Sequence, residues 1–448
     1  QTPHQLSGLK VELHLSPAVW RIQLLRSMRC GENCAGALVA LVLALTWSDP
    51  AAALRINAAR SLSLRGTWLQ KVAAGVALAS AVTLAPAPGL AVVNPMQDVG
   101  VGEFLVKDGG QHLRLTLPSP PTVDASADPL RKAQINLELV KLRLEQVGAR
   151  GPVWAQCSRE ADQAEKNLDA ATGSLVLPAD TKTAIVGEIR TLKQLIREEN
   201  LSAVNAQQVK AAEALAEARQ SLLPPKFLPF DPKPPEEFKN LPVLKGRAKV
   251  EFVIRHGNAQ SKFLLNPGET QEGATAKYSQ ELPLEVEVDG YHAPITAGNF
   301  IRLVSDGFYN NQKIDKAEEL IVQTGETNSD KLKSLVPLEL FYKRDQEPVY
   351  SFTSDEDQRA TETFFLPFQA YGAFGMARSP EDADSASSQV FFVKWDQALV
   401  PPGRNTLDGF YTCFGYTTKN AMLLKQVEPG DIVVSAKVLS GMENLVGR

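Results

Sequence analysis

Motifs for metal, nucleotide and nucleophile chemistry are absent from this sequence of 448 residues. It contains no G-x-S-x-G, P-loop or G-x-G-x-x-G pattern, so the serine-hydrolase and nucleotide-binding classes have almost no support. Histidine is scarce, and no two histidines have a ligand spacing such as H-x-x-x-H; the five are His4, His14, His112, His256 and His292. We therefore expect no bound metal and no cofactor.

Cysteine is equally scarce, with four residues in the whole chain. Cys30 and Cys34 fall in a basic front segment, whereas Cys157 and Cys413 lie far apart in the sequence. Four cysteines arranged in this way do not make a disulfide framework. We expect Cys157 and Cys413 to be buried as small hydrophobic side chains and not to form a redox pair.

Basic residues are fewer than acidic residues over most of the chain. The formal net charge is −4, but residues 1–91 carry eight basic and three acidic side chains, which leaves 39 basic and 48 acidic in residues 92–448. Such an acidic segment is a poor candidate for binding nucleic acid, because that affinity comes largely from basic contacts to phosphate. It is an equally poor candidate for anionic lipid surfaces.

Long hydrophobic runs are missing as well. The two apolar runs are residues 34–47, which are short for a membrane span of about 20 apolar residues, and residues 72–91, which are rich in Ala and Gly and interrupted by prolines. Between them, residues 54–71 are rich in Arg and Ser and lack acidic residues, as transit peptides do. We predict that residues 1–91 are a bipartite or tripartite targeting presequence, that the destination is the chloroplast thylakoid lumen, and that a membrane is involved only during targeting. One or two membrane anchors are the alternative.

A helical period of hydrophobicity runs through residues 128–223. Asp128 followed by Pro129 fits a helix N-cap and a first-turn proline. Seven apolar residues then form one broad stripe: Leu130, Ile135, Leu137, Leu139, Val140, Leu142 and Leu144. Amphipathic segments follow near 154–171, 179–199 and 202–222, and four such helices joined by short loops predict an antiparallel bundle.

Proline then marks a domain boundary, with six prolines among residues 222–235, and we expect an extended linker there. After about residue 245 the period becomes two, which predicts strands at 247–257, 282–290, 320–325, 336–342, 374–379, 389–395, 411–418 and 431–441. Helices are predicted at 294–308 and 419–427. Eight short strands with helices between them predict a closed barrel with helices at its ends.

The predicted domains are a presequence (1–91), an N-terminal extension with a strand at 102–108 (92–127), a helical bundle (128–223), a Pro-rich linker (224–244) and a barrel (245–448).

Four motifs in the barrel region occur in order: "APITAGNFIRLVSDGFYNNQKI" (293–314), "VQTGE" (322–326), "FGMARS…SSQVFFVKW" (374–395) and "LDGFYTCFGYTT" (407–418). Together they resemble the cyclophilin domain, the barrel of the peptidyl-prolyl isomerases, over about residues 245–448. The resemblance implies a multidomain α + β chain, with a helical bundle followed by a closed eight-stranded antiparallel barrel with two capping helices. The whole layout resembles the large thylakoid-lumen cyclophilins of plants and algae, which implies a chaperone role in the assembly and maintenance of photosystem II.

The resemblance also implies a proline-binding groove. Its apolar floor would consist of Leu320, Ile321, Phe391 and Leu407. Gln323 and Gln389 match polar residues that hold peptide carbonyls, and Ala377 matches a small residue beside the groove. Tyr411 falls where active members often carry histidine. Thr406 stands where members frequently carry tryptophan. Without the resemblance, core packing would explain the apolar residues and loop carbonyls would explain the glutamines.

The catalytic arginine of the family should lie eight residues before Gln323, where this chain has Asp315. Rotation about an X–Pro bond faces a barrier of about 18–20 kcal/mol. A carboxylate has no proton at pH 7 to donate to the prolyl nitrogen, so Asp315 is expected to be inactive. Lys316 could substitute only if the strand register shifts by one, because neighbouring strand residues point to opposite faces; lysine also lacks the rigid donor fork of arginine.

Three hypotheses follow. In the leading one, the barrel binds protein segments, such as photosystem II subunits or assembly intermediates, with little isomerase activity and without nucleic acid or metal. In the alternative, the barrel is an active peptidyl-prolyl cis-trans isomerase that uses Lys316 or another cation such as Arg378. In the third, the barrel is a scaffold and the bundle is the binding module.

Overall fold

A computed structural model of the chain describes residues 106–267, 275–326, 334–394 and 406–447. All of these residues belong to one compact unit. The predicted presequence, residues 1–91, and the first part of the predicted extension, residues 92–105, lie outside the described residues. Within the described ranges, no helix has both the length and the apolar character needed to cross a membrane.

The first described element is a short helix, α4 (Gly109–Thr116), inside the segment predicted to be an extension. The side chain of Asp108 caps it by accepting a hydrogen bond from the backbone N–H of Gln111. The strand predicted at 102–108 is therefore wrong where the structure can test it, because residues 106–108 are irregular and lead into this cap. Six of the eight residues of α4 are buried, so the helix is covered on more than one side.

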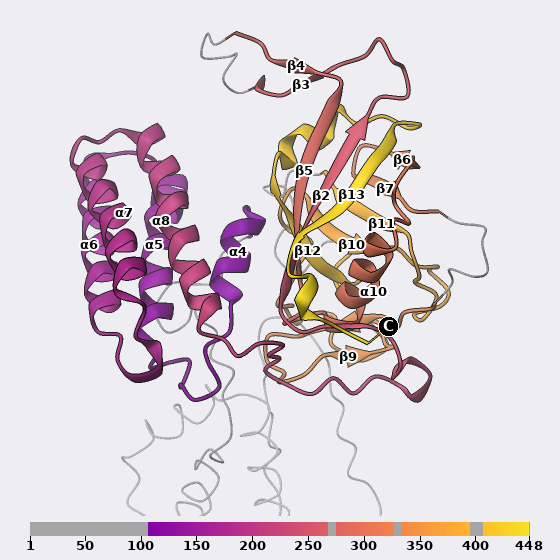
Figure 1. The fold of residues 1–448 in the computed structure, drawn as a ribbon, viewed down its shortest axis with the longest axis horizontal. Helices are drawn as coiled ribbons and strands as arrows, with labels where there is room; N and C mark the ends of the chain where they lie inside the picture. The colour runs from indigo at the N-terminus through magenta and orange to yellow at the C-terminus, as the bar shows by residue number, and fades with distance from the viewer. Residues whose placement is uncertain (1–105, 268–274, 327–333, 395–405, 448) are drawn as a thin grey trace, which may run out of the picture. The chain divides into compact units, whose positions relative to one another are not determined.

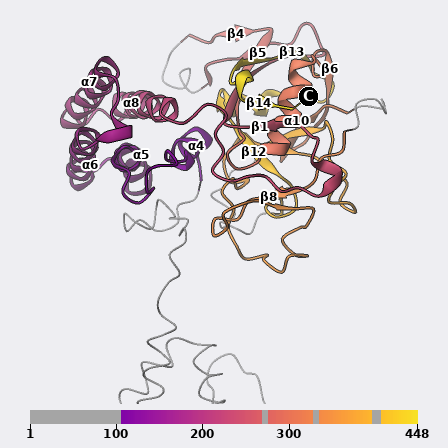
Figure 2. The same cartoon turned by 60° about the horizontal axis from the view of Figure 1, so that its bottom comes forward.

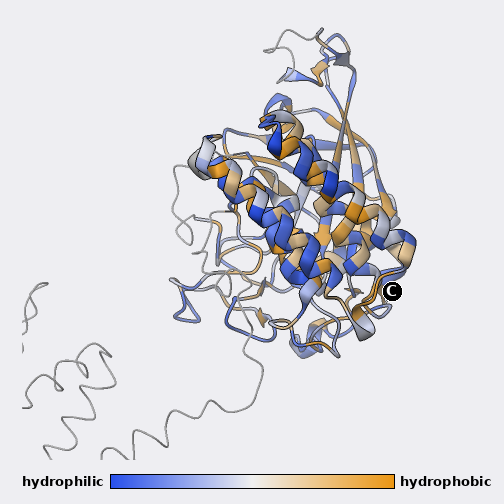
Figure 3. Cartoon of the chain, turned by 90° about the vertical axis from the view of Figure 1, so that its left-hand side faces the viewer, coloured by the Kyte–Doolittle hydropathy of each residue, from blue (hydrophilic) through white to orange (hydrophobic). Residues whose placement is uncertain are grey.

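Four long helices form the predicted bundle (Figure 1). They are α5 (Pro129–Val147), α6 (Gly151–Asp169), α7 (Ala179–Arg197) and α8 (Leu201–Ser221). Asp128 caps α5 through the N–H groups of Leu130 and Arg131, as predicted from the sequence. Hydrophilic and hydrophobic residues gather on different faces of the helices (Figure 3). Cys157 is a free, buried cysteine in the core of this bundle, which confirms the expectation for it.

The broad apolar stripe of α5 is explained by burial on two sides. Leu130, Leu137 and Val140 pack into the bundle core. On its other side, α5 forms a separate cluster with α4, made of Leu115, Ile135, Leu139 and Leu142. A helix that is apolar around most of its circumference needs neighbours on both sides, and α4 is the second neighbour.

A buried carboxylate joins α4 to the bundle. Glu138 of α5 has a fully buried side chain, and the guanidinium of Arg114 on α4 reaches both of its oxygens, at 2.6 Å from Nε and 3.2 Å from Nη2. The side-chain amides of Gln134 and Gln208 donate to the same carboxylate, each at 3.0 Å. The charge of Glu138 is therefore paired and hydrogen-bonded, as a buried charge must be.

Eight antiparallel strands close into a barrel in the order β10-β11-β7-β6-β13-β2-β5-β12. Their bounds are β2 (Arg247–Arg255), β5 (Glu281–Asp289), β6 (Gln312–Ala317), β7 (Ile321–Thr324), β10 (Ala373–Met376), β11 (Val390–Val393), β12 (Cys413–Lys419) and β13 (Ile432–Ser440). Helix α10 (Pro294–Ser305) contacts β1 (Val243–Leu244) and β14 (Leu445–Val446), and the three labels lie together in Figure 2. The predicted fold class is thus confirmed: a helical bundle followed by a closed eight-stranded antiparallel barrel.

Three details of the barrel differ from the sequence prediction. Strand β6 is a barrel strand that the pattern did not predict, and the segment predicted as a strand at 336–342 lies outside the barrel, where β8 (Glu339–Leu340) pairs with β9 (Val349–Tyr350). The helix predicted at 419–427 is the 3-10 helix η6 (Ala421–Gln426). The remaining short elements are η2 (Gly173–Leu175), η3 (Glu236–Phe238), β3 (Phe263–Leu264), β4 (Tyr278–Ser279) and η7 (Met442–Asn444).

Aromatic rings fill the barrel interior. Phe252 of β2 contacts Phe300 of α10 and, from the facing strands, Phe374 and Phe392, with ring centroids 5.8–6.2 Å apart. Aromatic pairs at such distances add to the stability gained from burial. Cys413 of β12 lies at the edge of this core, buried and free, as expected.

Another buried carboxylate caps α10, whose own N-cap residue, Ala293, has no capping side chain. Glu339 of β8 accepts hydrogen bonds from the backbone N–H groups of Ile295, at 3.3 Å, and Thr296, at 2.9 Å. The helix N-terminus favours negative charge, but burial outweighs this effect and raises the pKa of Glu339 to about 7.

Removing the carboxylate of Glu138 should leave the Arg114 guanidinium buried without its partner. We expect Glu138→Ala to lower the free energy of unfolding by about 3–5 kcal/mol, measured by chemical denaturation of the full chain. Glu145→Ala, on the same helix, removes a half-exposed carboxylate 3.9 Å from Lys141 and should cost under about 1 kcal/mol. Equal losses in the two variants would contradict this account of the Glu138 network.

The raised pKa of Glu339 also predicts a pH dependence of stability. Because the folded state holds this proton up to about pH 7, and an unfolded glutamate releases it near pH 4.5, the free energy of unfolding should fall as pH rises through that interval. Glu339→Gln removes the titration. The stability of the native protein minus that of Glu339→Gln should therefore decrease between about pH 4.5 and 7, by up to about 3 kcal/mol. Parallel pH profiles of the two proteins would contradict the burial of a titrating carboxyl group.

Candidate functional site

One row of residues runs across four neighbouring strands on the outside of the barrel. Gly375 of β10 pairs with Phe391 of β11, Phe391 pairs with Gln323 of β7, and Gln323 pairs with Lys316 of β6. Residues directly opposite each other in an antiparallel pair place their side chains on the same face. We call these four residues the outer row.

The adjacent row fixes which face is which. Phe374, Phe392 and Val322 are paired with one another and pack in the barrel core. Because successive residues of a strand point to opposite faces, the side chains of the outer row leave the sheet on the other face. There Phe391 is still buried and belongs to the same hydrophobic cluster.

Phe391 forms the centre of the outer row. Its ring is stacked on that of Phe368, with centroids 5.4 Å apart and planes at 19°, and Tyr411 meets it edge-on at 5.6 Å. Gly375 makes room for this arrangement, since a Cβ at that position would lie 2.5 Å from both Phe368 and Phe391. Only 3% of Phe391 is exposed and Phe368 is fully buried, so the two rings are held rigidly in place, and Tyr411 is the more exposed member of the aromatic group.

The two glutamines predicted to hold a peptide lie next to this aromatic group. Gln323 Nε2 donates a hydrogen bond to Gln389 Oε1 at 3.2 Å. The bond uses one donor of the first amide and one acceptor of the second. The backbone carbonyl of Gln389 also accepts from the N–H of Ala377 at 2.9 Å, which places Ala377 beside the pair.

The other predicted groove residues lie around this centre with different exposure. Ile321, Ala377, Leu407 and Tyr411 are partly buried and pack against the barrel core. Leu320, just before β7, is 48% exposed, and Thr406 is exposed as well. The structure therefore brings together Gln323, Ala377, Gln389, Phe391 and Tyr411 by direct contacts, whereas Leu320 and Thr406 lie on open surface.

A β-bulge decides which residue of β6 faces Gln323. Ile314 pairs with Thr324, and Lys316 pairs with Gln323. Between these two pairs β6 has one residue more than β7, and that extra residue is Asp315. The carboxylate of Asp315 accepts a hydrogen bond from the backbone N–H of Glu326 at 3.2 Å. This bulge supplies the one-residue shift that the sequence argument required for Lys316, and no feature of the local sequence announces it.

Lys316 and Arg378, the two cations considered from the sequence, have different surroundings. Arg378 donates from Nε to the carbonyl of Phe410 at 2.6 Å and from Nη1 to that of Ser379 at 2.7 Å. Its guanidinium also lies 5.4 Å from the centre of the Tyr411 ring. Lys316 is exposed, and among the described residues no carboxylate forms an ion pair with it. Lys316 is therefore the cation that is free to meet a ligand.

Sequence reasoning missed Phe368, which precedes β10 in a segment without strand pattern. Its backbone N–H donates to Asp408 Oδ1 at 2.7 Å, and its ring is fully buried. An aromatic residue next to a strand is normally assigned to the core, so only the stacking on Phe391 marks it as part of the site.

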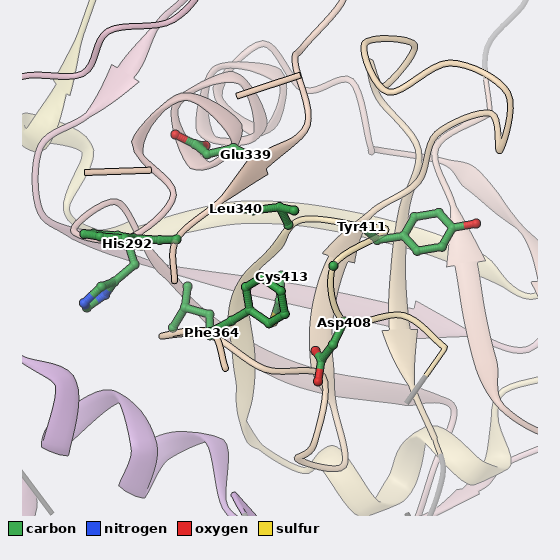
Figure 4. Close-up of a pocket in the computed structure, with 10 residues that line it drawn as sticks. His292, Glu339, Leu340, Phe364, Asp408, Tyr411 and Cys413 are labelled. Carbon is green, nitrogen blue, oxygen red and sulfur yellow. The ribbon is translucent and has the colours of Figure 1, made fainter. Parts of the chain in front are cut away.

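A small pocket lies behind Tyr411 (Figure 4). Glu339 and Asp408 stand on opposite sides of it, and the ring of Tyr411 points away from its centre (Figure 4). Tyr411 is the one predicted groove residue among its lining residues, which are His292, Glu339, Leu340, Phe341, Phe364, Leu366, Asp408, Gly409, Tyr411 and Cys413. The pocket contains none of the four residues of the outer row but adjoins the row, since Tyr411 meets Phe391 and Cys413 pairs with Gly375.

Parts of this chain resemble known proteins. Residues 275–442 match the family described as "Cyclophilin type peptidyl-prolyl cis-trans isomerase/CLD". The Synechocystis protein named "Putative thylakoid lumen peptidyl-prolyl cis-trans isomerase sll0408" is 38% identical over 222 residues, which are 47% of this chain and 52% of that protein. "Peptidyl-prolyl cis-trans isomerase CYP38, chloroplastic" of Arabidopsis thaliana is 36% identical over 220 residues, 47% of this chain and 46% of that protein.

The chain thus spans about half the length of these relatives. A crystal structure of a cyclophilin type isomerase from Cryptosporidium parvum has 19% sequence identity and a TM-score of 0.25, and covers 35% of this chain and 93% of that one. The names of the two relatives, which state thylakoid lumen and chloroplast, confirm the localisation predicted from the sequence. Residues 275–442, which contain most of the closed barrel, are therefore similar to the cyclophilin-type peptidyl-prolyl cis-trans isomerases.

Proposed function

We propose that the outer row binds proline-containing protein segments in the thylakoid lumen and that the barrel isomerises their X–Pro bonds, with Lys316 as the cation. The observation that carries the proposal is the pairing of Lys316 with Gln323 across the bulge in β6. It puts a free ammonium group on the same face as the aromatic centre at Phe391 and the glutamine pair.

The chemistry requires only a donor at the prolyl nitrogen. Amide resonance hinders X–Pro rotation, and a cation that donates to the nitrogen lone pair withdraws it from conjugation. The ammonium group of Lys316 has three such donors. Lysine is a flexible point charge without the planar fork of arginine, so we propose slow turnover. This keeps part of the expectation from the sequence, namely weak activity.

The same residues suggest how a segment would be held while it turns. The aromatic group of Phe391 and the partly buried Tyr411 would give a proline ring an apolar contact, and the glutamine pair at Gln323 and Gln389 would offer hydrogen bonds to peptide carbonyls. Binding of this kind, without fast turnover, is also what a chaperone needs. Photosystem II subunits and their assembly intermediates are the proposed clients, supported by the lumenal localisation and the family resemblance.

Removal of the Lys316 charge tests the isomerase proposal. Lys316→Met should lower kcat/KM of the full chain for a short X–Pro peptide about 10- to 100-fold, because the donor at the prolyl nitrogen is lost. Lys316→Arg should raise it. Lys313→Met, at an exposed position of the same strand, is the matched control and should leave the rate within about twofold.

A barrel that binds without isomerising is the second candidate. It is favoured by Asp315, which stands eight residues before Gln323, where the family resemblance implies the catalytic arginine. It predicts no measurable turnover in the native protein or in Lys316→Met, and a gain of activity in Asp315→Arg. Under the proposal, Asp315→Arg leaves the Lys316-dependent turnover in place. The pair of variants at positions 315 and 316 therefore decides between the two functions in one assay.

A further inference from the structure

A short loop supports the aromatic centre of the site. We call residues 364–370 the Phe368 loop, since they carry the ring that stacks on Phe391. Hydrogen bonds from two parts of the chain fasten this loop. Within the barrel domain, the Phe368 N–H donates to Asp408, the Tyr416 hydroxyl donates to the carbonyl of Pro367 at 2.8 Å, and the Phe365 N–H donates to the carbonyl of Phe341 at 2.9 Å.

Two further bonds come from the N-terminal segment. His112 Nε2 lies 2.5 Å from the carbonyl oxygen of Phe365, and the backbone N–H of Val106 donates to Gln369 Oε1 at 3.1 Å. Both residues lie far outside the part of the chain, residues 275–442, that matches the cyclophilin family. Two of the hydrogen bonds that hold the Phe368 loop are therefore supplied from outside that domain.

Helix α4 is seated tightly against the barrel where it makes this contact. Gly109 lies so close to Tyr416 that a Cβ on it would be 2.3 Å from the Tyr416 Cβ. The ring of His112 meets Tyr416 edge-on at 5.8 Å, and Leu113 is part of the barrel core. Tyr416 thus contacts both α4 and the Phe368 loop.

The opposite side of α4 is held by the bundle. Arg114 binds the buried carboxylate of Glu138, and Leu115 packs on α5. A helix fixed on both sides cannot shift without breaking contacts on one of them, so α4 presents His112 to the Phe368 loop at a fixed place.

In the hydrogen bond between His112 and Phe365, the histidine can only be the donor. A carbonyl oxygen can only accept, so Nε2 carries the proton and donates it to Phe365. Burial lowers the pKa of His112 to about 3, which keeps the imidazole neutral.

We propose that α4 sets the position of the Phe368 ring, and through it the apolar contact for proline at Phe391, with His112 as a positioning residue. The proposal rests on the proposed function of the outer row and deepens it. The helical part of the chain controls how well the barrel binds proline segments, through the contact of α4 with the Phe368 loop. His112 touches neither the peptide nor the reacting bond, so its effect should fall on binding and leave the chemical step to Lys316.

Substitution of His112 separates positioning from simple packing. His112→Phe keeps an aromatic ring against Tyr416 but removes the donor to Phe365. We expect KM for an X–Pro peptide to rise about three- to tenfold, with kcat within about twofold, in the full chain. His112→Gln, whose amide can donate from a similar reach, should restore KM to within about twofold of the native value.

A matched control comes from another buried histidine, His256 in the barrel domain. His256 stacks on Phe263 and bonds to Asp431, and its exposure, 7%, is close to the 9% of His112. His256→Phe should leave KM unchanged. Gly109→Ala provides a second, independent displacement of α4 and should raise KM as His112→Phe does.

Amide NMR signals provide a readout that needs no peptide. In His112→Phe, the signals of Gly375, Gln323 and Phe391 should shift, whereas in His256→Phe they should not. Unchanged KM and unchanged signals in His112→Phe, or the same changes in His256→Phe, would overturn the positioning role. If the native protein neither binds nor turns over any proline peptide, the proposed function fails, and the NMR comparison still decides whether α4 positions the Phe368 ring.

Discussion

The pairing of β6 with β7 is the contact on which the candidate site depends. In a closed antiparallel barrel, each strand residue faces either the core or the outside, and the alternation leaves no third choice. One extra residue in β6, Asp315, therefore moves Lys316 onto the face of Gln323 and Phe391. Bulges occur beside functional sites because they redirect a side chain in this way without disturbing the strands on either side.

The second constraint is that both the barrel and the bundle pack against α4. A helix of only eight residues would be marginal by itself. Here it is held between the aromatic barrel and the bundle, with Leu113 in one core and Leu115 in another cluster. The described bundle and barrel thus belong to one compact unit, and the loop under Phe391 depends on residues far from it in sequence.

Three buried ionisable groups show how polar contacts fix this arrangement. Glu138 is matched by a guanidinium and two amides, and Glu339 by the N-terminus of α10. Arg219 of α8 donates to the backbone carbonyls of Arg114 and Leu117, at the end of α4, and burial lowers its pKa to about 9. Each partner set exists in one geometry only, and a buried polar group loses several kcal/mol if its partners move away.

The sequence by itself determined the helices α5 to α8, the strand-rich barrel and most residues of the outer face. Asp128 before Pro129 and the apolar period of residues 128–223 are local signals, and local signals suffice where each helix buries one face in a bundle. Tertiary structure alone decided the place of Lys316, because a bulge is a relation between two strands and not a property of either. It also decided the roles of α4 and Phe368, whose residues are unremarkable until partners distant in the chain, Tyr416 and Phe391, come to lie against them.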